Sequence, residues 1–245
     1  MTMKSQILHY PRMTKILMSR REWKRLAIRQ TDYNIFFSTS NLMGVAWVLK
    51  SNESAKTVEG ALERAGATKL GAFKVDCTAY RPTLDVAGQI KNFYVLHHSA
   101  YPDSSSIFGE LSTDVTNVSP RATSDLGFDL ILQKFSNGLL SDNALSFELN
   151  GFEYALRDFR IRFGVALMGR SSSKGVIVEF EFAACNIVKE CIGLLSELVN
   201  SFFPEQSKAM PLPLIRQKKE LENYYSSDSL EQYLRIFQEM RSLSN

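Results

Sequence analysis

The stretch DFRIRFGVALMGRSSSKGVIVEFEF, which runs from Asp158 to Phe182, decides the fold of this chain. Apolar and polar residues alternate along both of its arms, and the short polar loop 169–175 separates the arms. Alternation at every second residue is typical of a β-strand with one buried face. Two such strands joined by a short loop with a glycine at each end predict an antiparallel β-hairpin.

Four charged residues lie on the arms of this hairpin. Because side chains alternate between the faces of a strand, Arg160 and Arg162 share one face of the first arm, and Glu179 and Glu181 share one face of the second. The two sets can meet as cross-strand ion pairs on the polar face of the hairpin. Each such pair contributes about 0.2–1 kcal/mol when it is exposed to water.

The same four residues allow a catalytic interpretation. Two glutamates separated by one residue on a barrel strand can hold a divalent cation, and arginines can bind phosphate oxygens, as in tunnel-type triphosphate hydrolases. Such a site needs further carboxylates from other strands, and the neighbouring sequence offers Glu153 and Asp158. We therefore favour structural cross-strand pairs and keep a metal-dependent triphosphate hydrolase, with its Glu-x-Glu site in the barrel lumen, as the alternative.

Outside the hairpin, short apolar or alternating stretches predict further strands. They cover residues 44–50, 70–77, 91–99, 105–112, 144–149 and 151–157. Short turns join most of these strands and few helices interrupt them, which favours an antiparallel sheet or barrel over βαβ units. We expect an α+β protein built on an antiparallel β-barrel of about eight strands with flanking helices.

Helical periodicity predicts four flanking helices. They cover 55–65 with Ser54 as N-cap, 125–135, 186–203 with Asn186 as N-cap, and a closing helix that Ser229 caps and that ends near Arg241. Residues 204–225 contain prolines and a charged run and are expected to form a linker. The closing helix has an apolar face that we expect to pack on this domain, and its Leu230, Leu234 and Phe237 are our candidates for contact with a neighbouring subunit.

Residues 1–42 differ from the rest in charge. They hold eight basic and two acidic residues, whereas the remaining 203 residues hold 21 basic and 24 acidic ones. A mildly acidic body argues against a broad nucleic-acid footprint, although the basic segment alone keeps direct nucleic-acid binding as a weaker alternative. We expect 1–42 to be a disordered extension or a start placed too far upstream, with a mitochondrial presequence as another possibility, and 43–245 to be one domain.

The remaining chemistry-bearing residues indicate a structural role. The three cysteines contain no CxxC pair, and the three histidines offer few zinc ligands, so we expect no disulfide scaffold, metal or other cofactor. His97 and His98 are adjacent on a predicted strand and must face opposite sides, so we expect one to be buried and the other to lie near the surface. No run of about 18 uncharged apolar residues exists, so no transmembrane helix is predicted.

Several stretches in collinear order resemble the Mediator subunit 20 family, also known as the TRF-proximal protein homologues. They are Met43-Gly44-Val45 and residues 66–80, 94–102, 128–135, 152–188 and 228–241. The resemblance begins near Met43, so residues 1–42 have no counterpart in it. It spans about 200 residues, and its specificity comes from the length and order of the matches rather than from a catalytic motif.

The resemblance implies a nuclear, non-enzymatic coactivator subunit of the Mediator head module. Its β-barrel would pair directly with the related barrel of Mediator subunit 18, and Mediator subunit 8 would tether that pair to the head. The assembly would act on the RNA polymerase II machinery, without a membrane and without direct sequence-specific nucleic-acid binding. The family barrel is similar to that of RNA triphosphatases, but the family is not known for enzymatic activity.

Overall fold

The computed structural model describes most of the chain after residue 43. The described residues are 44–83, 90–111, 120–125, 127–134, 138–169, 172–218 and 222–242. The expectations for residues 1–42, whether extension, presequence or nucleic-acid segment, lie outside the described residues.

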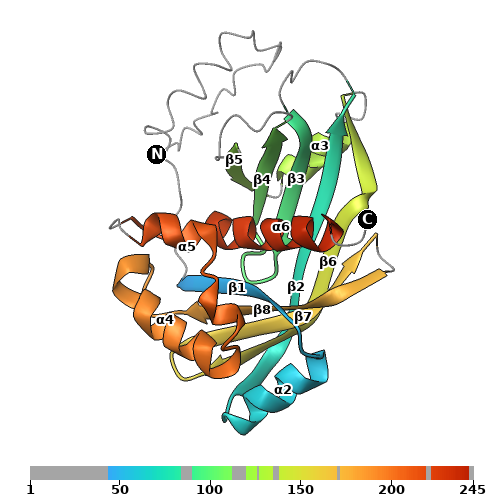
Figure 1. Cartoon of the computed structure of the whole chain (residues 1–245). Helices are drawn as coiled ribbons and strands as arrows, with labels where there is room; N and C mark the ends of the chain where they lie inside the picture. The colour runs from blue at the N-terminus through green and yellow to red at the C-terminus, as the bar shows by residue number, and fades with distance from the viewer. Residues whose placement is uncertain are drawn as a thin grey trace, which may run out of the picture. The chain divides into compact units, whose positions relative to one another are not determined.

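Eight strands form one antiparallel sheet (Figure 1). They are β1 (Val45–Ser51), β2 (Thr68–Pro82), β3 (Ile90–His98), β4 (Ser104–Leu111), β5 (Arg121–Asp125), β6 (Leu139–Leu156), β7 (Phe159–Met168) and β8 (Ser172–Phe182). Their order is β1-β8-β7-β6-β2-β3-β4-β5. The expected fold class is confirmed, with a curled half-barrel whose strand order ends at β1 and β5.

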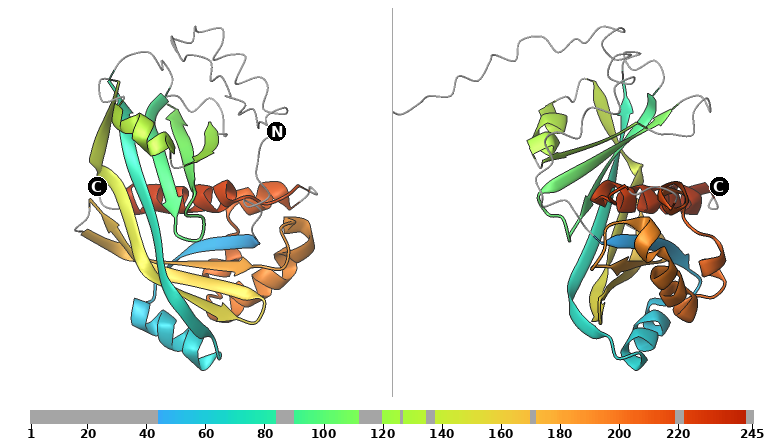
Figure 2. Two further views of the ribbon diagram at one scale, coloured as in Figure 1. Left: turned by 180° about the vertical axis from the view of Figure 1, so that it is seen from behind. Right: turned by 90° about the vertical axis from the view of Figure 1, so that its left-hand side faces the viewer.

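The long strands β2 and β6 give the sheet its curl, because they run through both halves of it (Figure 2). The sequence predicted two pieces, 144–149 and 151–157, in place of β6, but the strand continues through Asn150. Gly151 pairs with Gly164 on β7, and a Cβ at Gly151 would lie only 1.8 Å from the carbonyl oxygen of Phe163. The glycine therefore permits a close backbone approach instead of ending the strand.

The β7–β8 hairpin predicted from the sequence is confirmed. Phe159 pairs with Phe182 at the open end, and the strands continue to Met168 and Ser172. A register shift interrupts the ladder after Ala166, on the side of the loop. A bulge at this place increases the local twist of the two strands.

The flanking helices largely follow the sequence pattern. They are α2 (Ala55–Arg64), α3 (Gly127–Lys134), α4 (Val188–Phe202), the short 3-10 helix η3 (Gln206–Lys208), α5 (Leu212–Gln217) and α6 (Ser226–Ser242). The predicted cap of α2 is confirmed, since the Ser54 hydroxyl accepts from the Thr57 amide at 3.2 Å. Among these helices none is long and apolar enough to cross a membrane.

Three local predictions about the C-terminal part are wrong. Residues 204–225 are not merely a linker, because they contain η3 and α5. The Asn186 side chain does not cap α4; it donates to the Asn223 side chain at 3.3 Å instead. Helix α6 begins three residues before Ser229, where Asp228 Oδ2 accepts from the Tyr225 amide at 2.9 Å and so satisfies a donor of the first turn.

Two apolar cores lie on opposite faces of the sheet. Helices α2 and α4 cover one face, where Trp47 and Phe180 of the sheet meet Leu195 of α4. Helix α6 crosses the other face (Figures 1 and 2), where Tyr233 and Phe237 pack among strand residues. Burying each such large side chain contributes roughly 1.5–3 kcal/mol, so α6 is an integral part of the domain.

Helix α6 also covers the outer edge of β1. Gln232 Oε1 accepts from the Val48 amide at 2.9 Å, and Gln232 Nε2 donates to the Ala46 carbonyl at 2.9 Å. The Tyr224 hydroxyl reaches the same carbonyl at 3.1 Å. An edge strand normally leaves such groups open for pairing with another chain. Here one amide side chain takes the place of a neighbouring strand.

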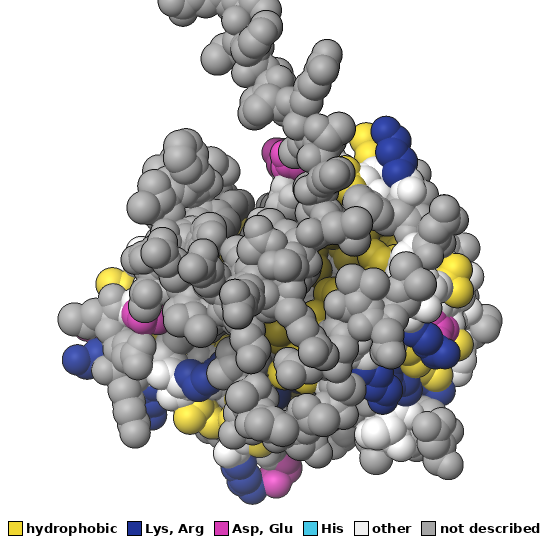
Figure 3. Space-filling view, turned by 90° about the horizontal axis from the view of Figure 1, so that it is seen from above, with side chains coloured by type: hydrophobic (Ala, Val, Ile, Leu, Met, Phe, Trp, Pro, Cys, Tyr) yellow, Lys and Arg dark blue, Asp and Glu magenta, His cyan; other side chains and the backbone are white. Residues whose placement is uncertain are grey.

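The surface seen along the vertical axis of Figure 1 is mixed in character. Between the residues drawn in grey, hydrophobic side chains are visible together with Lys and Arg side chains and a few Asp or Glu side chains (Figure 3). Large apolar side chains that remain exposed in the described residues are Leu70, Leu130, Ile131, Leu140, Phe152, Leu194, Leu212 and Ile215. They are distributed over several elements, and α5 carries two of them.

Candidate functional site

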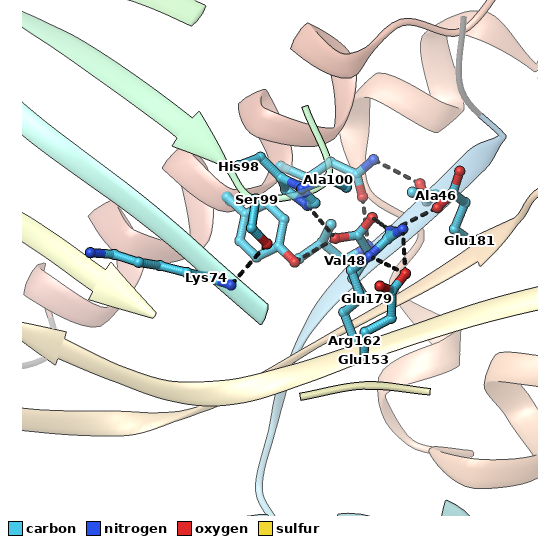
Figure 4. Close-up of polar contacts among 12 residues, drawn as sticks. Ala46, Val48, Lys74, His98, Ser99, Ala100, Glu153, Arg162, Glu179 and Glu181 are labelled. Carbon is cyan, nitrogen blue, oxygen red and sulfur yellow. Dashed lines mark hydrogen bonds and ion pairs between the residues drawn. The ribbon is translucent and has the colours of Figure 1, made fainter. Parts of the chain in front are cut away.

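The charged residues of the hairpin form a compact network around Arg162 (Figure 4). Arg162 Nη1 donates to Glu179 Oε1 at 2.9 Å and to Glu181 Oε2 at 2.7 Å. Its Nε and Nη2 reach Glu153 Oε1 at 3.1 and 2.9 Å. The Gly44 amide donates to Glu181 Oε1 at 3.0 Å. Strand register explains the meeting, because Arg162 lies opposite Glu153 on β6 and opposite Glu179 on β8.

Two further side chains bind Glu179 from outside the hairpin. Glu179 Oε2 accepts from the Tyr233 hydroxyl of α6 at 2.6 Å and contacts His98 Nε2 of β3 at 3.0 Å. The Ala100 amide donates to His98 Nδ1 at 3.1 Å, so Nδ1 is the acceptor and Nε2 carries the proton. Glu179 thereby connects β8, β3 and α6 at one point.

The two glutamates differ in electrostatics although they share Arg162. Burial raises the pKa of Glu179, but Arg162 and the bonds from His98 and Tyr233 more than offset it and bring the pKa down to about 2. Burial raises the pKa of Glu181, and Arg162 offsets this only in part because Glu179 repels a second negative charge. Of the two carboxylates that bind Arg162, Glu179 is therefore held more firmly in its charged form.

The cross-strand pairing of Arg162 and Glu179 is confirmed, but the expected polar surface is not. Arg162 is 5 % exposed, Glu179 0 % and Glu181 6 %. Helix α6 covers this face, which the hairpin sequence by itself does not reveal. The value for exposed pairs does not apply, since removing one partner of a buried ion pair costs about 3–5 kcal/mol.

Arg160 lies outside this network. The register places it opposite Glu181, yet within the described segments no hydrogen bond or ion pair joins the two side chains. Arg160 remains half-buried near the open end of the hairpin. The four hairpin charges thus divide into three that meet and one that does not.

The triphosphate alternative requires carboxylates that are free to hold a cation in an accessible lumen. Glu179 and Glu181 do lie on the concave face, with Glu153 as a third carboxylate. However, Arg162 binds all three, and Tyr233 of α6 also donates to Glu179. Across the residues that the structure describes, no three His, Cys, Asp or Glu side chains are grouped to share a metal ion. The geometry fits attachment of α6 to the sheet better than binding of a substrate.

His97 and His98 face opposite sides, as predicted, with His98 2 % exposed and His97 partly exposed. His97 Nδ1 lies 2.9 Å from Asp76 Oδ1, and Nε2 lies 2.9 Å from Asp129 Oδ2. The hydrogen bond to Asp76 raises the pKa of His97, burial lowers it, and Asp129 raises it further. When both hydrogen bonds form, both ring nitrogens donate, so the ring must be in its imidazolium form. We call this contact of His97 with Asp76 and Asp129 the His97 clamp.

The same histidine makes a contact that resembles part of a catalytic triad. Ser105 Oγ lies 3.0 Å from His97 Nε2, on the side opposite Asp76. A serine nucleophile needs a free base and access to substrate. Here Ser105 is 0 % exposed and Asp129 occupies the same ring nitrogen. The cluster joins α3 to β2, β3 and β4, and sequence analysis missed it because Asp76 and Asp129 are distant in the chain.

The residues that we expected at a partner interface are buried within the molecule. Leu230 is 2 % exposed, Leu234 6 % and Phe237 1 %, and all three pack against the sheet. This agrees with the expectation that the helix packs on its own domain, while a contact of these three side chains with a neighbouring subunit stays an untested prediction. The physical reason is that the half-barrel needs an apolar element to cover its concave face.

Comparisons with known proteins identify the family. The family model described as "TATA-binding related factor (TRF) of subunit 20 of Mediator complex" matches residues 43–238. Mediator of RNA polymerase II transcription subunit 20 of Caenorhabditis briggsae is 36% identical over 200 residues, which cover 81% of this chain and 98% of that protein. The Homo sapiens protein of the same name is 30% identical over 203 residues, covering 81% and 91%.

Solved structures give more distant matches. A chain of the Schizosaccharomyces pombe Mediator head module matches with a TM-score of 0.36 and 11% identity, over 69% of this chain and 96% of that one. The Hippeastrum protein HpAC1, described as having a dominant triphosphatase activity, matches with a TM-score of 0.41 and 11% identity, over 74% and 100%. The family model and the sequence relatives decide the assignment: the chain belongs to the Mediator subunit 20 family.

Proposed function

We propose that this protein is a non-enzymatic subunit of the Mediator head module that pairs directly with Mediator subunit 18. In this proposal, Mediator subunit 8 attaches the pair to the head, and the assembly acts in the nucleus as a coactivator of RNA polymerase II. The observation that carries it is the match of residues 43–238 to the Mediator subunit 20 family, whose members bear names that state a role in RNA polymerase II transcription.

The buried network supports a role without catalysis. A reactive carboxylate must be reachable by a substrate or a cation, whereas Glu179 is fully buried and accepts from three side chains. Burial of charged groups with every partner inside the chain is a device for fixing an element in place. We infer that the network serves to hold α6, and that residues 43–245 act as one domain without a cofactor, a membrane or sequence-specific nucleic-acid contacts.

The pairing is tested with the full chain and subunit 18 of the same organism. The two are co-expressed, and light scattering on a sizing column measures the mass of the eluted species. We expect a stable one-to-one complex that persists at physiological salt. Two separate monomer peaks from folded proteins would overturn the proposed pairing.

The non-enzymatic part has its own test. The purified protein is incubated with a nucleoside triphosphate and manganese, and phosphate release is followed beside Glu179→Gln and the exposed control Glu197→Gln. We expect no release above the protein-free blank in any sample. If the protein released phosphate, and the release were lost in Glu179→Gln but kept in Glu197→Gln, hydrolysis would take place at the hairpin carboxylates and the proposal would be overturned. Circular dichroism checks that both variants are folded.

A further inference from the structure

Three arginines from three different elements gather around one carboxylate on α6. Arg216 of α5 reaches Glu231 Oε1 at 2.6 Å, and Arg235 of α6 reaches the same oxygen at 2.9 Å. Arg121 of β5 lies 3.5 Å from Glu231 Oε2 and 2.5 Å from Asp228 Oδ1. Three cations thus share two carboxylates, and the cluster carries an excess of positive charge.

In this cluster the carboxylates are buried, whereas the guanidinium groups are partly exposed. The side chains of Asp228 and Glu231 are only 1% and 10% exposed, whereas those of Arg121, Arg216 and Arg235 are 36%, 43% and 35% exposed. A molecule that approaches this place therefore meets guanidinium groups, while the compensating carboxylates are below them. A guanidinium has five N–H donors, and the contacts to Glu231 and Asp228 use only some of those available.

An apolar surface adjoins these cations. On α5, Leu212 and Ile215 are 51% and 47% exposed, while Pro213 and Leu214 between them are buried. Leu212, Ile215 and Arg216 have the spacing i, i+3 and i+4, so they share one face of the helix. Helix α5 lies beside the first turns of α6 (Figure 1), and the ion pair of Arg216 with Glu231 fixes this arrangement.

We propose that this place, the α5–α6 face defined by Leu212, Ile215, Arg216, Arg235 and Arg121, docks a flexible segment of another protein. The segment that fits carries carboxylates next to large apolar side chains. Its apolar residues would cover Leu212 and Ile215, and its carboxylates would meet the outer N–H groups of the arginines. The argument is charge complementarity, because a basic surface beside an apolar one matches an acidic and apolar peptide.

The face is prepared for such a contact. Each arginine is already held by a buried carboxylate, so less side-chain entropy is lost when a second carboxylate binds. Arginine matches carboxylate geometry with two parallel donors, which lysine does not. The proposal goes beyond pairing with subunit 18, because its occupant is a flexible peptide rather than a folded barrel.

The test is fluorescence polarisation with the full chain and a short labelled peptide in which aspartates alternate with leucine and phenylalanine. Two matched peptides replace every aspartate by asparagine, or every leucine and phenylalanine by serine. Protein variants are Leu212→Ser with Ile215→Ser, and Arg216→Gln with Arg235→Gln. The control is Arg81→Gln, which removes an exposed arginine that pairs with Asp142 at 2.6 Å on a distant part of the sheet.

We expect both double variants to weaken binding of the first peptide by about fivefold or more, which corresponds to about 1 kcal/mol. Arg81→Gln should leave it unchanged, and both substituted peptides should bind more weakly. Equal binding of the serine peptide would indicate mere charge attraction and would overturn the proposal, as would unchanged binding by either double variant. Loss of the subunit 18 complex in the Leu212→Ser, Ile215→Ser protein would assign this face to the subunit interface instead and would likewise overturn it.

Discussion

Two charge clusters of this molecule use the same residue types in opposite ways. Around Arg162, one guanidinium serves three carboxylates, and the cation with its two inner partners is buried. Around Glu231, three guanidinium groups surround one carboxylate and remain partly in water. The first cluster is completed by residues of this chain alone. The second leaves donors at the surface that another molecule can use.

The difference teaches that exposure, rather than the presence of ion pairs, separates structural from interactive charge. A buried ion pair is costly to break because the charge that remains is not solvated by water. An exposed pair contributes little to stability, so its residues can be shared with a partner at a small cost. Substitutions in the two clusters should therefore have very different effects on unfolding.

The largest effect is expected for Arg162→Met, which keeps most of the side-chain volume but removes the charge. Glu179 and Glu181 would remain buried without a cation, and breaking a buried pair in this way costs about 3–5 kcal/mol. Urea unfolding measures the loss. Adding Glu179→Gln and Glu181→Gln to the same protein should recover part of it, and a loss below about 1 kcal/mol would show that water reaches these carboxylates.

An intermediate effect is expected where a neutral group is buried beside the network. Gln232→Ala would remove the partner of the Val48 amide on the edge of β1 and one of two partners of the Ala46 carbonyl. Leaving a buried donor unsatisfied costs about 1–3 kcal/mol. Thermal and urea unfolding would be compared with Gln238→Ala on the same helix. Equal stability of the two variants would mean that water replaces the amide at the edge.

A small effect is expected in the exposed cluster. Arg216→Gln removes one of three cations around Glu231, and two others remain. Because Arg216 is 43% exposed, solvent screening limits the loss to less than about 1 kcal/mol. Urea unfolding in low and high salt measures it, with Arg81→Gln as the matched exposed arginine. A loss comparable to that of Arg162→Met would abolish the distinction between the clusters.

The sequence predicted the elements better than it predicted their environment. Alternation in 158–182 was enough to predict that Arg160 and Arg162 can meet Glu179 and Glu181 across the hairpin, and the observed register brings Arg162 opposite Glu179. Alternation could not tell whether that face meets water, since the covering helix begins more than forty residues later. The clamp on His97 was invisible for the same reason, as its partners come from β2 and α3.

Local capping signals were also misleading where tertiary contacts decide. Ser229 follows a typical N-cap pattern, yet α6 begins at Ser226 and Ser229 is fully buried. Asp228 accepts a hydrogen bond from the Tyr225 amide, and it forms an ion pair with Arg121 of β5, the last strand in the order of the sheet. The contact with the Tyr225 amide is local, whereas the ion pair with Arg121 spans 107 residues of sequence and no short window contains it.

The smallest and most local effect is the pH dependence of the His97 cluster, which is less buried than the network around Arg162. Its pKa is raised, chiefly by the hydrogen bond to Asp76, so the protonated form is favoured in the folded state. The stabilisation is therefore fully present below the unfolded pKa of about 6.5 and is lost as pH rises through the higher folded value. Since Asp129 binds the same ring, this loss should loosen α3.

Hydrogen exchange of the α3 amides measures that loosening. After correction for intrinsic rates, protection of residues 127–134 should fall between about pH 6 and pH 8, the range in which histidine titrates. His97→Gln should remove the pH dependence, while amides of α4 serve as an internal control in both proteins. If protection of α3 rose with pH, the neutral ring would be the form that binds Asp129, and the clamp would depend on a single donor as His98 does at Glu179.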